Sequence, residues 1–120
     1  MMITEIDHVQ LAMPAGGEDQ ARRFYCDILG FEETPKPDEL AKRGGAWFEC
    51  NGARIHLGVD PNFVPAKKAH PALRCDGYET LVEAIRSAGY DVVEDPVPFE
   101  GRPHCYVSDP FGNRIELIPE

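Results

Sequence analysis

The chain has 120 residues, of which 42% are hydrophobic, and its formal net charge is -9. This length suits one domain with a real core. The acidic balance excludes nucleic acid and an anionic membrane surface as expected partners, because both are themselves negatively charged. No apolar run approaches the roughly 20 residues of a membrane helix, and the N-terminus lacks the basic start and apolar core of a secretory signal.

The cysteines form no C-x-x-C pair, and a domain of this size does not depend on disulfides for its core. The four cysteines are Cys26, Cys50, Cys75 and Cys105. We therefore expect reduced thiols and a cytoplasmic protein.

The first half of the chain predicts a strand, a helix and a hairpin. Apolar and polar residues alternate over 3–13, and a single apolar stripe runs along 19–29 as far as Gly30, which suits a helix cap. In chain order we expect a strand at 3–13, a helix at 19–29, a short edge strand within 31–40, and strands at 45–50 and 53–59 joined by an Asn51-Gly52 turn.

The second half repeats this order after a linker. In chain order we expect a strand at 70–75, a helix at 79–88, a proline-punctuated strand at 91–98, and a closing hairpin of 106–108 and 114–118 around Asp109–Asn113. The predicted organisation is a single domain, with one module at about 1–60, a linker at about 61–69 and a second module at about 70–120.

Three landmarks support a duplication. The segment RIHL at 54–57 matches RIEL at 114–117, and the opening strand of each half contains a histidine, His8 or His70. Gly30 and Gly89, which follow the two predicted helices, are also separated by about 60 residues. A fixed offset of this kind is the signature of a repeated unit. The predicted fold is therefore α+β, with two tandem βαβββ modules forming a curved, cup-shaped mixed sheet and the helices on its outer face.

The repeat places four metal-ligating side chains at equivalent positions. The candidate ligands are His8, His56, His70 and Glu116. Side chains alternate between the two faces of a strand, so His56 and Glu116 lie opposite the apolar neighbours that need a covering helix. We expect all four to line the concave face. Three imidazoles and one carboxylate favour Zn, Ni, Co, Fe or Mn over Ca or Mg as a divalent metal.

A smaller ligand set is also possible. The triad His8, His70 and Glu116 matches the two-histidine, one-carboxylate arrangement of non-haem iron sites. His56 is the weakest member of the set, because three ligands already complete a site.

Other polar residues are interpreted more simply. Because side chains alternate along a strand, Arg54, Arg74 and Arg114 are expected on the same side as the ligands. There they would either bind an anionic substrate or face the solvent. His104 has no counterpart in the repeat and is assigned to the substrate side, the surroundings of a ligand, or the surface. Asp109 is interpreted as a turn residue.

Three features of the chain resemble a known family. The paired modules, the closing segment DPFGNRIEL and the opening segment DHVQLA resemble the vicinal oxygen chelate superfamily, which includes glyoxalase I, fosfomycin-resistance thiol transferases, methylmalonyl-CoA epimerase, extradiol dioxygenases and bleomycin-resistance proteins. The resemblance covers essentially the whole chain.

The resemblance implies His8, His70 and Glu116 as metal ligands, with the residue at position 56 as a fourth in glyoxalase-like and epimerase-like members. Those members carry Glu or Gln there, and this chain departs from both with His56. The resemblance also implies a homodimer, with the cup completed by modules of two subunits or within one chain.

The resemblance implies substrate chelation through adjacent oxygens, with the metal as a Lewis acid. Our first hypothesis is a metal-dependent glyoxalase-like lyase or isomerase acting on a small oxygenated substrate. The alternatives are an Fe(II) extradiol-type dioxygenase and a non-catalytic small-molecule or drug-binding resistance protein. A lyase or isomerase also needs a general base, for which Glu116, His56, Glu49 and His104 are candidates.

Overall fold

The computed structural model describes residues 2–120 and contains two βαβββ modules in tandem. The elements of the first module are β1 (Val9–Met13), α1 (Glu18–Arg22), the π-helix η1 (Arg23–Ile28), β2 (Glu32–Thr34), α2 (Asp38–Ala41), β3 (Ala46–Cys50) and β4 (Ala53–Val59). Those of the second are β5 (Ala72–Cys75), α3 (Tyr78–Ser87), β6 (Val92–Glu94), β7 (Cys105–Ser108) and β8 (Arg114–Pro119).

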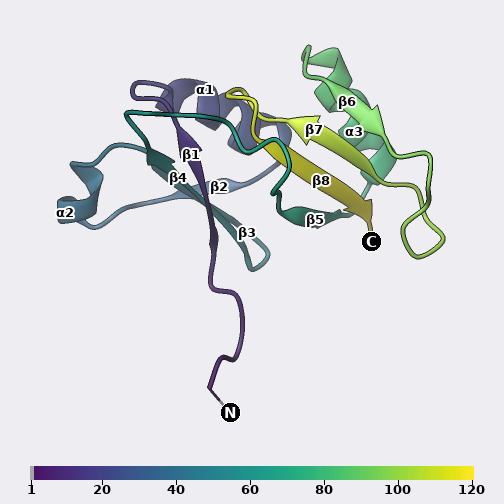
Figure 1. The fold of residues 1–120 in the computed structure, drawn as a ribbon, viewed down its shortest axis with the longest axis horizontal. Helices are drawn as coiled ribbons and strands as arrows, with labels where there is room; N and C mark the ends of the chain where they lie inside the picture. The colour runs from purple at the N-terminus through teal and green to yellow at the C-terminus, as the bar shows by residue number, and fades with distance from the viewer. Residues whose placement is uncertain (1) are drawn as a thin grey trace.

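The strands form two open four-stranded sheets with the same topology (Figure 1). Their orders are β1-β4-β3-β2 and β5-β8-β7-β6. In each module the first strand pairs in parallel with the last, and the other pairs are antiparallel. The predicted tandem modules are confirmed. Within the described residues β1 and β5 are not hydrogen-bonded to each other, so one chain contains two sheets side by side and no continuous eight-stranded sheet.

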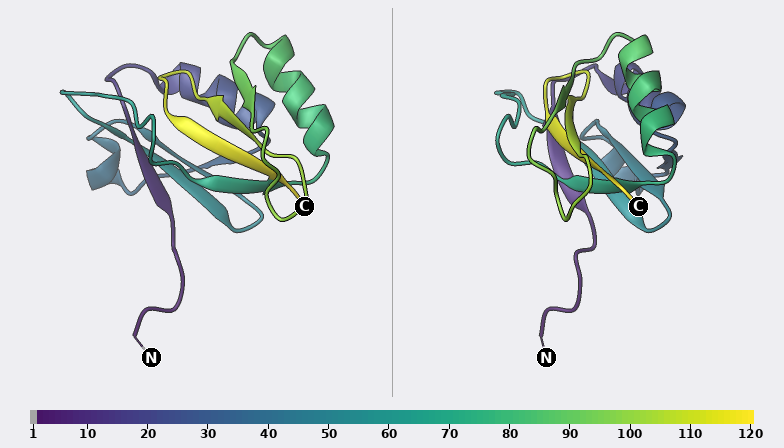
Figure 2. Two further views of the ribbon diagram at one scale, coloured as in Figure 1. Left: turned by 45° about the vertical axis from the view of Figure 1, so that its right-hand side comes forward. Right: turned by 90° about the vertical axis from the view of Figure 1, so that its right-hand side faces the viewer.

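The core is one apolar cluster shared by both modules. It contains Phe24 and Tyr25 from η1, Phe48 from β3, Ile85 from α3 and Leu117 from β8. The helices η1 and α3 contact each other, and Figure 2 shows them side by side. The predicted apolar stripe of the first helix is confirmed, because Ala21, Phe24 and Tyr25 are completely buried.

Several predicted bounds differ from the structure. The opening strand begins at Val9; Asp7 and His8 still contact β4, and the residues before them form an N-terminal arm that extends away from the sheets (Figure 1). The strand β5 begins at Ala72, so His70 precedes it. The short helix α2 was not expected; an Asp and a Glu occupy its first turn, where they complement the helix dipole.

The predicted turns are confirmed by their backbone angles. Asn51 and Gly52 both have positive φ, at 48° and 87°, as a type I′ hairpin turn requires. Gly30 and Gly89, with φ of 83° and 90°, follow the two main helices in the left-handed conformation of a C-terminal cap.

The closing turn is organised by two buried polar side chains, Asp109 and Asn113. Asp109 accepts hydrogen bonds from the backbone N–H groups of Phe111 and Asn113, both at 2.9 Å, and from the Tyr25 hydroxyl at 2.8 Å. The Asn113 amide donates to the carbonyl of Ala12 in β1 at 2.8 Å. Asp109 is therefore a turn residue, as predicted, and the turn also joins the two modules.

We predict that Tyr25→Phe lowers the free energy of unfolding by about 1–2 kcal/mol, because one hydrogen bond to a buried carboxylate is lost. Chemical denaturation measures this change. Tyr90→Phe is the matched control. Its ring also packs on Phe24, but within residues 2–120 its hydroxyl has no hydrogen-bond partner. Equal effects of the two substitutions would show that the contact with Asp109 contributes nothing.

Candidate metal centre

Glu116 lies at the centre of a polar cluster on the second sheet. It stands on β8 opposite Tyr106 of β7 and Ala72 of β5. Only 8% of the residue is exposed. Both carboxylate oxygens have a histidine partner: Oε1 is 2.9 Å from His70 Nε2, and Oε2 is 2.8 Å from His104 Nδ1.

The backbone fixes the orientation of His70. Its Nδ1–H donates to the carbonyl of Lys68 at 2.7 Å. In the neutral ring, Nε2 therefore carries the lone pair and faces a carboxylate oxygen that is also an acceptor. Two acceptors 2.9 Å apart are stable only with a cation between them, which is either a proton or a metal ion.

His104 is buried and donates to protein acceptors on both sides of its ring. Its Nδ1 is 2.8 Å from Glu116 Oε2 and its Nε2 is 2.8 Å from the carbonyl of Val97, and both nitrogens donate when the ring is an imidazolium. Burial lowers the pKa of His104, but the hydrogen bonds to Val97 and Glu116 and the charge of Asp95 outweigh it, so the net pKa is raised. Its ring thus supports Glu116 and leaves no nitrogen free for a substrate.

The first module contributes a stack of three rings. His56 on β4 lies between Trp47 on β3, with ring centroids 4.2 Å apart, and His8, with centroids 3.9 Å apart. His8 precedes β1, and its Nδ1 is 2.9 Å from an Asp7 carboxylate oxygen. Burial and the neighbouring His8 lower the pKa of His56, which favours its neutral form.

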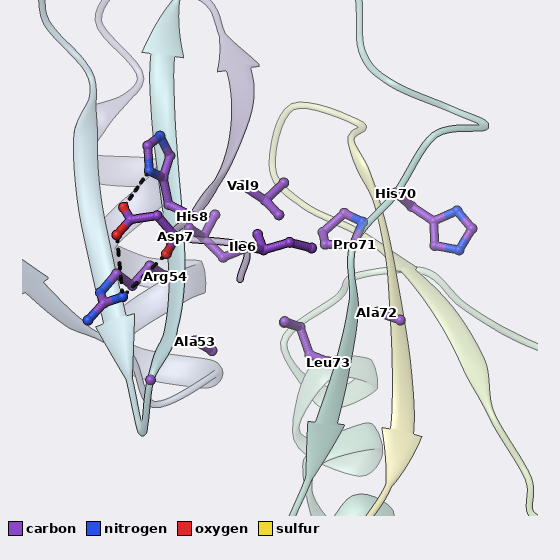
Figure 3. A pocket seen from close by; sticks show the side chains of 12 residues that line it. Ile6, Asp7, His8, Val9, Ala53, Arg54, His70, Pro71, Ala72 and Leu73 are labelled. Atoms are coloured by element: carbon purple, nitrogen blue, oxygen red, sulfur yellow. Dashed lines mark hydrogen bonds and ion pairs between the residues drawn. The ribbon is translucent and has the colours of Figure 1, made fainter. Parts of the chain in front are cut away.

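The four predicted ligands occupy two separate places in one chain. Figure 3 shows His8 and His70 on opposite sides of a pocket, with their rings directed away from it. Apolar side chains lie between them, among them Ile6, Val9 and Leu73. Within residues 2–120, no group of three or more His, Cys, Asp or Glu side chains is close enough to hold a metal ion. The chain thus brings together His70 with Glu116, and His8 with His56.

The substrate-side arginines differ in their partners. Arg54 forms an ion pair with Asp7 at 3.8 Å (Figure 3) and another with Glu49 at 3.5 Å, so its charge is already compensated. Arg114 lies over the Tyr106 ring, with its guanidinium carbon 3.8 Å from the centroid. Among residues 2–120 it has no carboxylate partner within 4.0 Å. Arg74 is exposed on β5.

Two aromatic neighbours of the site were missed. Trp47 and Tyr106 lie directly opposite His56 and Glu116 in the antiparallel ladders. A signal for Trp47 was present in the sequence, because positions 47 and 56 are equally distant from the Asn51-Gly52 turn. No equivalent two-residue turn marks the register of Tyr106.

Comparison with known proteins is consistent with this architecture. The model of the Glyoxalase/Bleomycin resistance protein/Dioxygenase superfamily matches residues 5–117. The chain belongs to this superfamily. A protein from Synechocystis named "Probable lactoylglutathione lyase" is 32% identical over 114 residues, which are 86% of this chain and 87% of the relative.

Solved structures show the same fold. The crystal structure of a protein from Bacillus anthracis, whose name places it in the glyoxalase family, superposes with a TM-score of 0.90 at 46% identity, over 100% of this chain and 98% of that one. The fosfomycin resistance protein FosX from Listeria monocytogenes superposes with a TM-score of 0.78 at 18% identity, over 99% and 95% of the two chains. None of the helices within residues 2–120 is long and apolar enough to cross a membrane.

We predict that the fluorescence of Trp47, the single tryptophan, titrates with His56. Protonation of the stacked imidazole places a cation on the indole face, so the emission changes as the pH falls. The midpoint is expected below the ordinary histidine pKa of 6.5, because the pKa of His56 is lowered. His56→Gln should abolish the transition, and His8→Gln should move it upward. A midpoint at or above 6.5 in the unmodified chain would contradict the stacked arrangement.

Proposed function

We propose that the chain is a metal-dependent enzyme of the glyoxalase type, a lyase or isomerase that acts on a small oxygenated substrate. The observation that carries this proposal is the pair formed by His70 Nε2 and Glu116 Oε1, 2.9 Å apart on one open sheet face. The name of the Synechocystis relative supports the type of reaction.

His70 Nε2 and Glu116 Oε1 are suitable ligand atoms for a divalent transition metal. Zn²⁺ binds histidine nitrogen and carboxylate oxygen at about 2.0–2.2 Å, so two such ligand atoms stand about 3.0 Å apart at an angle of about 90° and about 3.4 Å apart at a tetrahedral angle. The Lys68 carbonyl accepts a hydrogen bond from His70 Nδ1–H, so the lone pair of Nε2 is available to a metal ion. His104 forms a hydrogen bond with the other oxygen of Glu116. Supports of this kind around the ligands are typical of metal sites.

His8 is the proposed third ligand, supplied by a second copy of the chain. In one chain its ring is directed away from His70 across the apolar pocket (Figure 3). The strands β1 and β5 are both edges of their sheets, and unpaired edges are ready templates for another chain. A dimer that joins the first module of one copy to the second module of the other would assemble the ligands.

Exposed apolar residues of the N-terminal arm support the same dimer. Met2, Ile3 and Ile6 are 96%, 91% and 80% exposed. Isolated apolar residues on a surface are common, but a protruding apolar arm next to an unpaired strand is typical of an interface. The arm leads directly into His8, so its burial against a partner would also fix this ligand.

His56 is proposed as a fourth ligand only if its ring leaves the stack. The lone pair of an imidazole nitrogen lies in the plane of its ring, and the rings of His56 and His8 are only 17° from parallel. Two such rings cannot both direct a lone pair at one ion between them. Within the stack, His56 has no hydrogen-bond partner in the described residues and is available as a general base.

A bound divalent ion would supply Lewis acidity toward a substrate carbonyl. The chain itself would hold the substrate beside Glu116. Arg114, stacked on Tyr106 and without a carboxylate partner in residues 2–120, is the proposed contact for an anionic group of the substrate. Glu49 is already paired with Arg54, which leaves His56 as the preferred base and Glu116 as a ligand.

The experiment is an assay of the Ni²⁺- or Zn²⁺-loaded protein with lactoylglutathione, the compound in the name of the relative. We expect metal-dependent turnover that Glu116→Gln abolishes while circular dichroism shows a retained fold. Calorimetry should show that Glu116→Gln and His8→Ala each lose more than the roughly 10–100-fold in metal affinity typical of an outer-sphere partner. His56→Ala is the comparison variant and should lose less.

Other outcomes select the other hypotheses. Oxygen consumption with catechols and Fe(II), without lyase turnover, would indicate a dioxygenase using the His8, His70 and Glu116 triad. If the wild-type chain binds no Ni²⁺, Zn²⁺, Fe²⁺ or Mn²⁺, both enzyme proposals fail and a non-catalytic binder remains.

A mixing experiment tests the shared site. His8→Ala and Glu116→Gln chains each disable every site in their own dimers. If sites are shared, random mixed dimers contain one intact site, so co-expression should restore about a quarter of the wild-type metal sites. Metal content of the purified mixture measures this. A site built within one chain predicts no restoration, because every chain then carries a defect in its own site.

A further inference from the structure

The ring of His104 is committed to two protein acceptors, and this commitment suggests a defined role. We propose that His104 is a positioning residue, which fixes the Glu116 carboxylate and attaches the segment 95–104 between β6 and β7 to it. The inference rests on the proposed function, because Glu116 is taken as a metal ligand.

The first argument is the order of hydrogen bonds. When the ring of His104 is an imidazolium, both nitrogens carry hydrogen, so Nε2–H faces the Val97 carbonyl, which is only an acceptor, and Nδ1–H faces Glu116 Oε2. Rotating the ring would break both bonds at once. With 6% of the residue exposed, water cannot readily replace the lost partners, so this orientation is strongly preferred.

The second argument concerns which carboxylate oxygen remains available. Because Oε2 accepts from His104, Oε1 is the oxygen that faces His70. Without His104 the carboxyl group is free to rotate about its terminal torsion, which has a broad energy minimum. His104 therefore holds the carboxylate in the orientation that directs one oxygen at His70.

The third argument is that the segment 95–104 folds around His104. The backbone N–H of Asp95 donates to the His104 carbonyl at 3.0 Å, and that of Val97 donates to the Asp95 carboxylate at 2.9 Å. The Tyr106 hydroxyl donates to the same carboxylate at 3.2 Å. The segment forms the long loop between β6 and β7 in Figure 1. Its order and the placement of Glu116 are thus coupled through one ring.

Two substitutions separate the two bonds. The amide of Asn occupies approximately the place of Nδ1, so His104→Asn retains a donor to Glu116. The longer Gln reaches approximately the place of Nε2, so His104→Gln retains a donor to Val97. We expect His104→Gln to lose roughly 10–100-fold in Zn²⁺ or Ni²⁺ affinity by calorimetry, as for other outer-sphere partners, and His104→Asn to lose clearly less.

A purely structural His104 predicts a different pattern. Metal affinity would then follow the melting temperature of each metal-free variant, whichever bond it retains. Equal losses of affinity, or a greater loss in His104→Asn, would overturn the proposal.

A measurement on the unmodified chain covers the case in which neither variant folds. Zn²⁺ is titrated while the ¹⁵N signals of the histidine rings are followed by NMR. We expect the Nε2 signal of His70 to change on metal binding, while both nitrogens of His104 remain hydrogen-bonded and free of metal. A metal-bound nitrogen on His104 would make it a ligand and overturn the inference. Zn²⁺ binding that leaves His70 unchanged would instead overturn the proposed function.

Discussion

The buried turn at Asp109–Asn113 is the constraint on which the rest of the structure depends. Asp109 closes the turn through two backbone N–H groups and also accepts from the Tyr25 hydroxyl of the other module. Asn113 reaches the Ala12 carbonyl in β1. Because the side-chain period of a strand is two, a slip of one residue in β8 would exchange Glu116 with the buried Ile115 or Leu117. The turn therefore fixes both the register that places Glu116 between His70 and His104 and the relation between the modules.

Backbone carbonyls orient the two histidine rings of the polar cluster around Glu116. The carbonyls of Lys68 and Val97 accept from the outer nitrogens of His70 and His104, so the inner nitrogens of both rings face Glu116. A carbonyl can only accept a hydrogen bond. These two backbone groups therefore determine which nitrogen of each ring must carry a hydrogen. The gap between His104 and Glu116 is closed to solvent, whereas the His70 side is more open. The two contacts of Glu116 therefore differ in their access to solvent.

The first module offers a contrasting environment. His56 stacks between His8 and Trp47, and within residues 2–120 neither histidine ring forms a hydrogen bond with a backbone carbonyl. Burial and a neighbouring imidazole lower the pKa of His56, which favours the neutral ring that a ligand or a base requires. An apolar pocket separates this stack from the second sheet (Figure 3). The duplicated fold thus carries two histidine clusters with different electrostatics.

The sequence by itself determined the tandem modules, the turn residues and the faces of the strands, because each follows from local periodicity or backbone preference. It also supplied Glu116 and the histidines as candidates through the 60-residue repeat. Only the tertiary structure decided that His104 supports Glu116, that Arg54 is neutralised while Arg114 is not, and that His8 and His70 diverge within one chain. Hydrogen-bond partners, ion pairs and ring directions arise between segments distant in sequence, and a pattern along the chain does not encode the angle between two sheets.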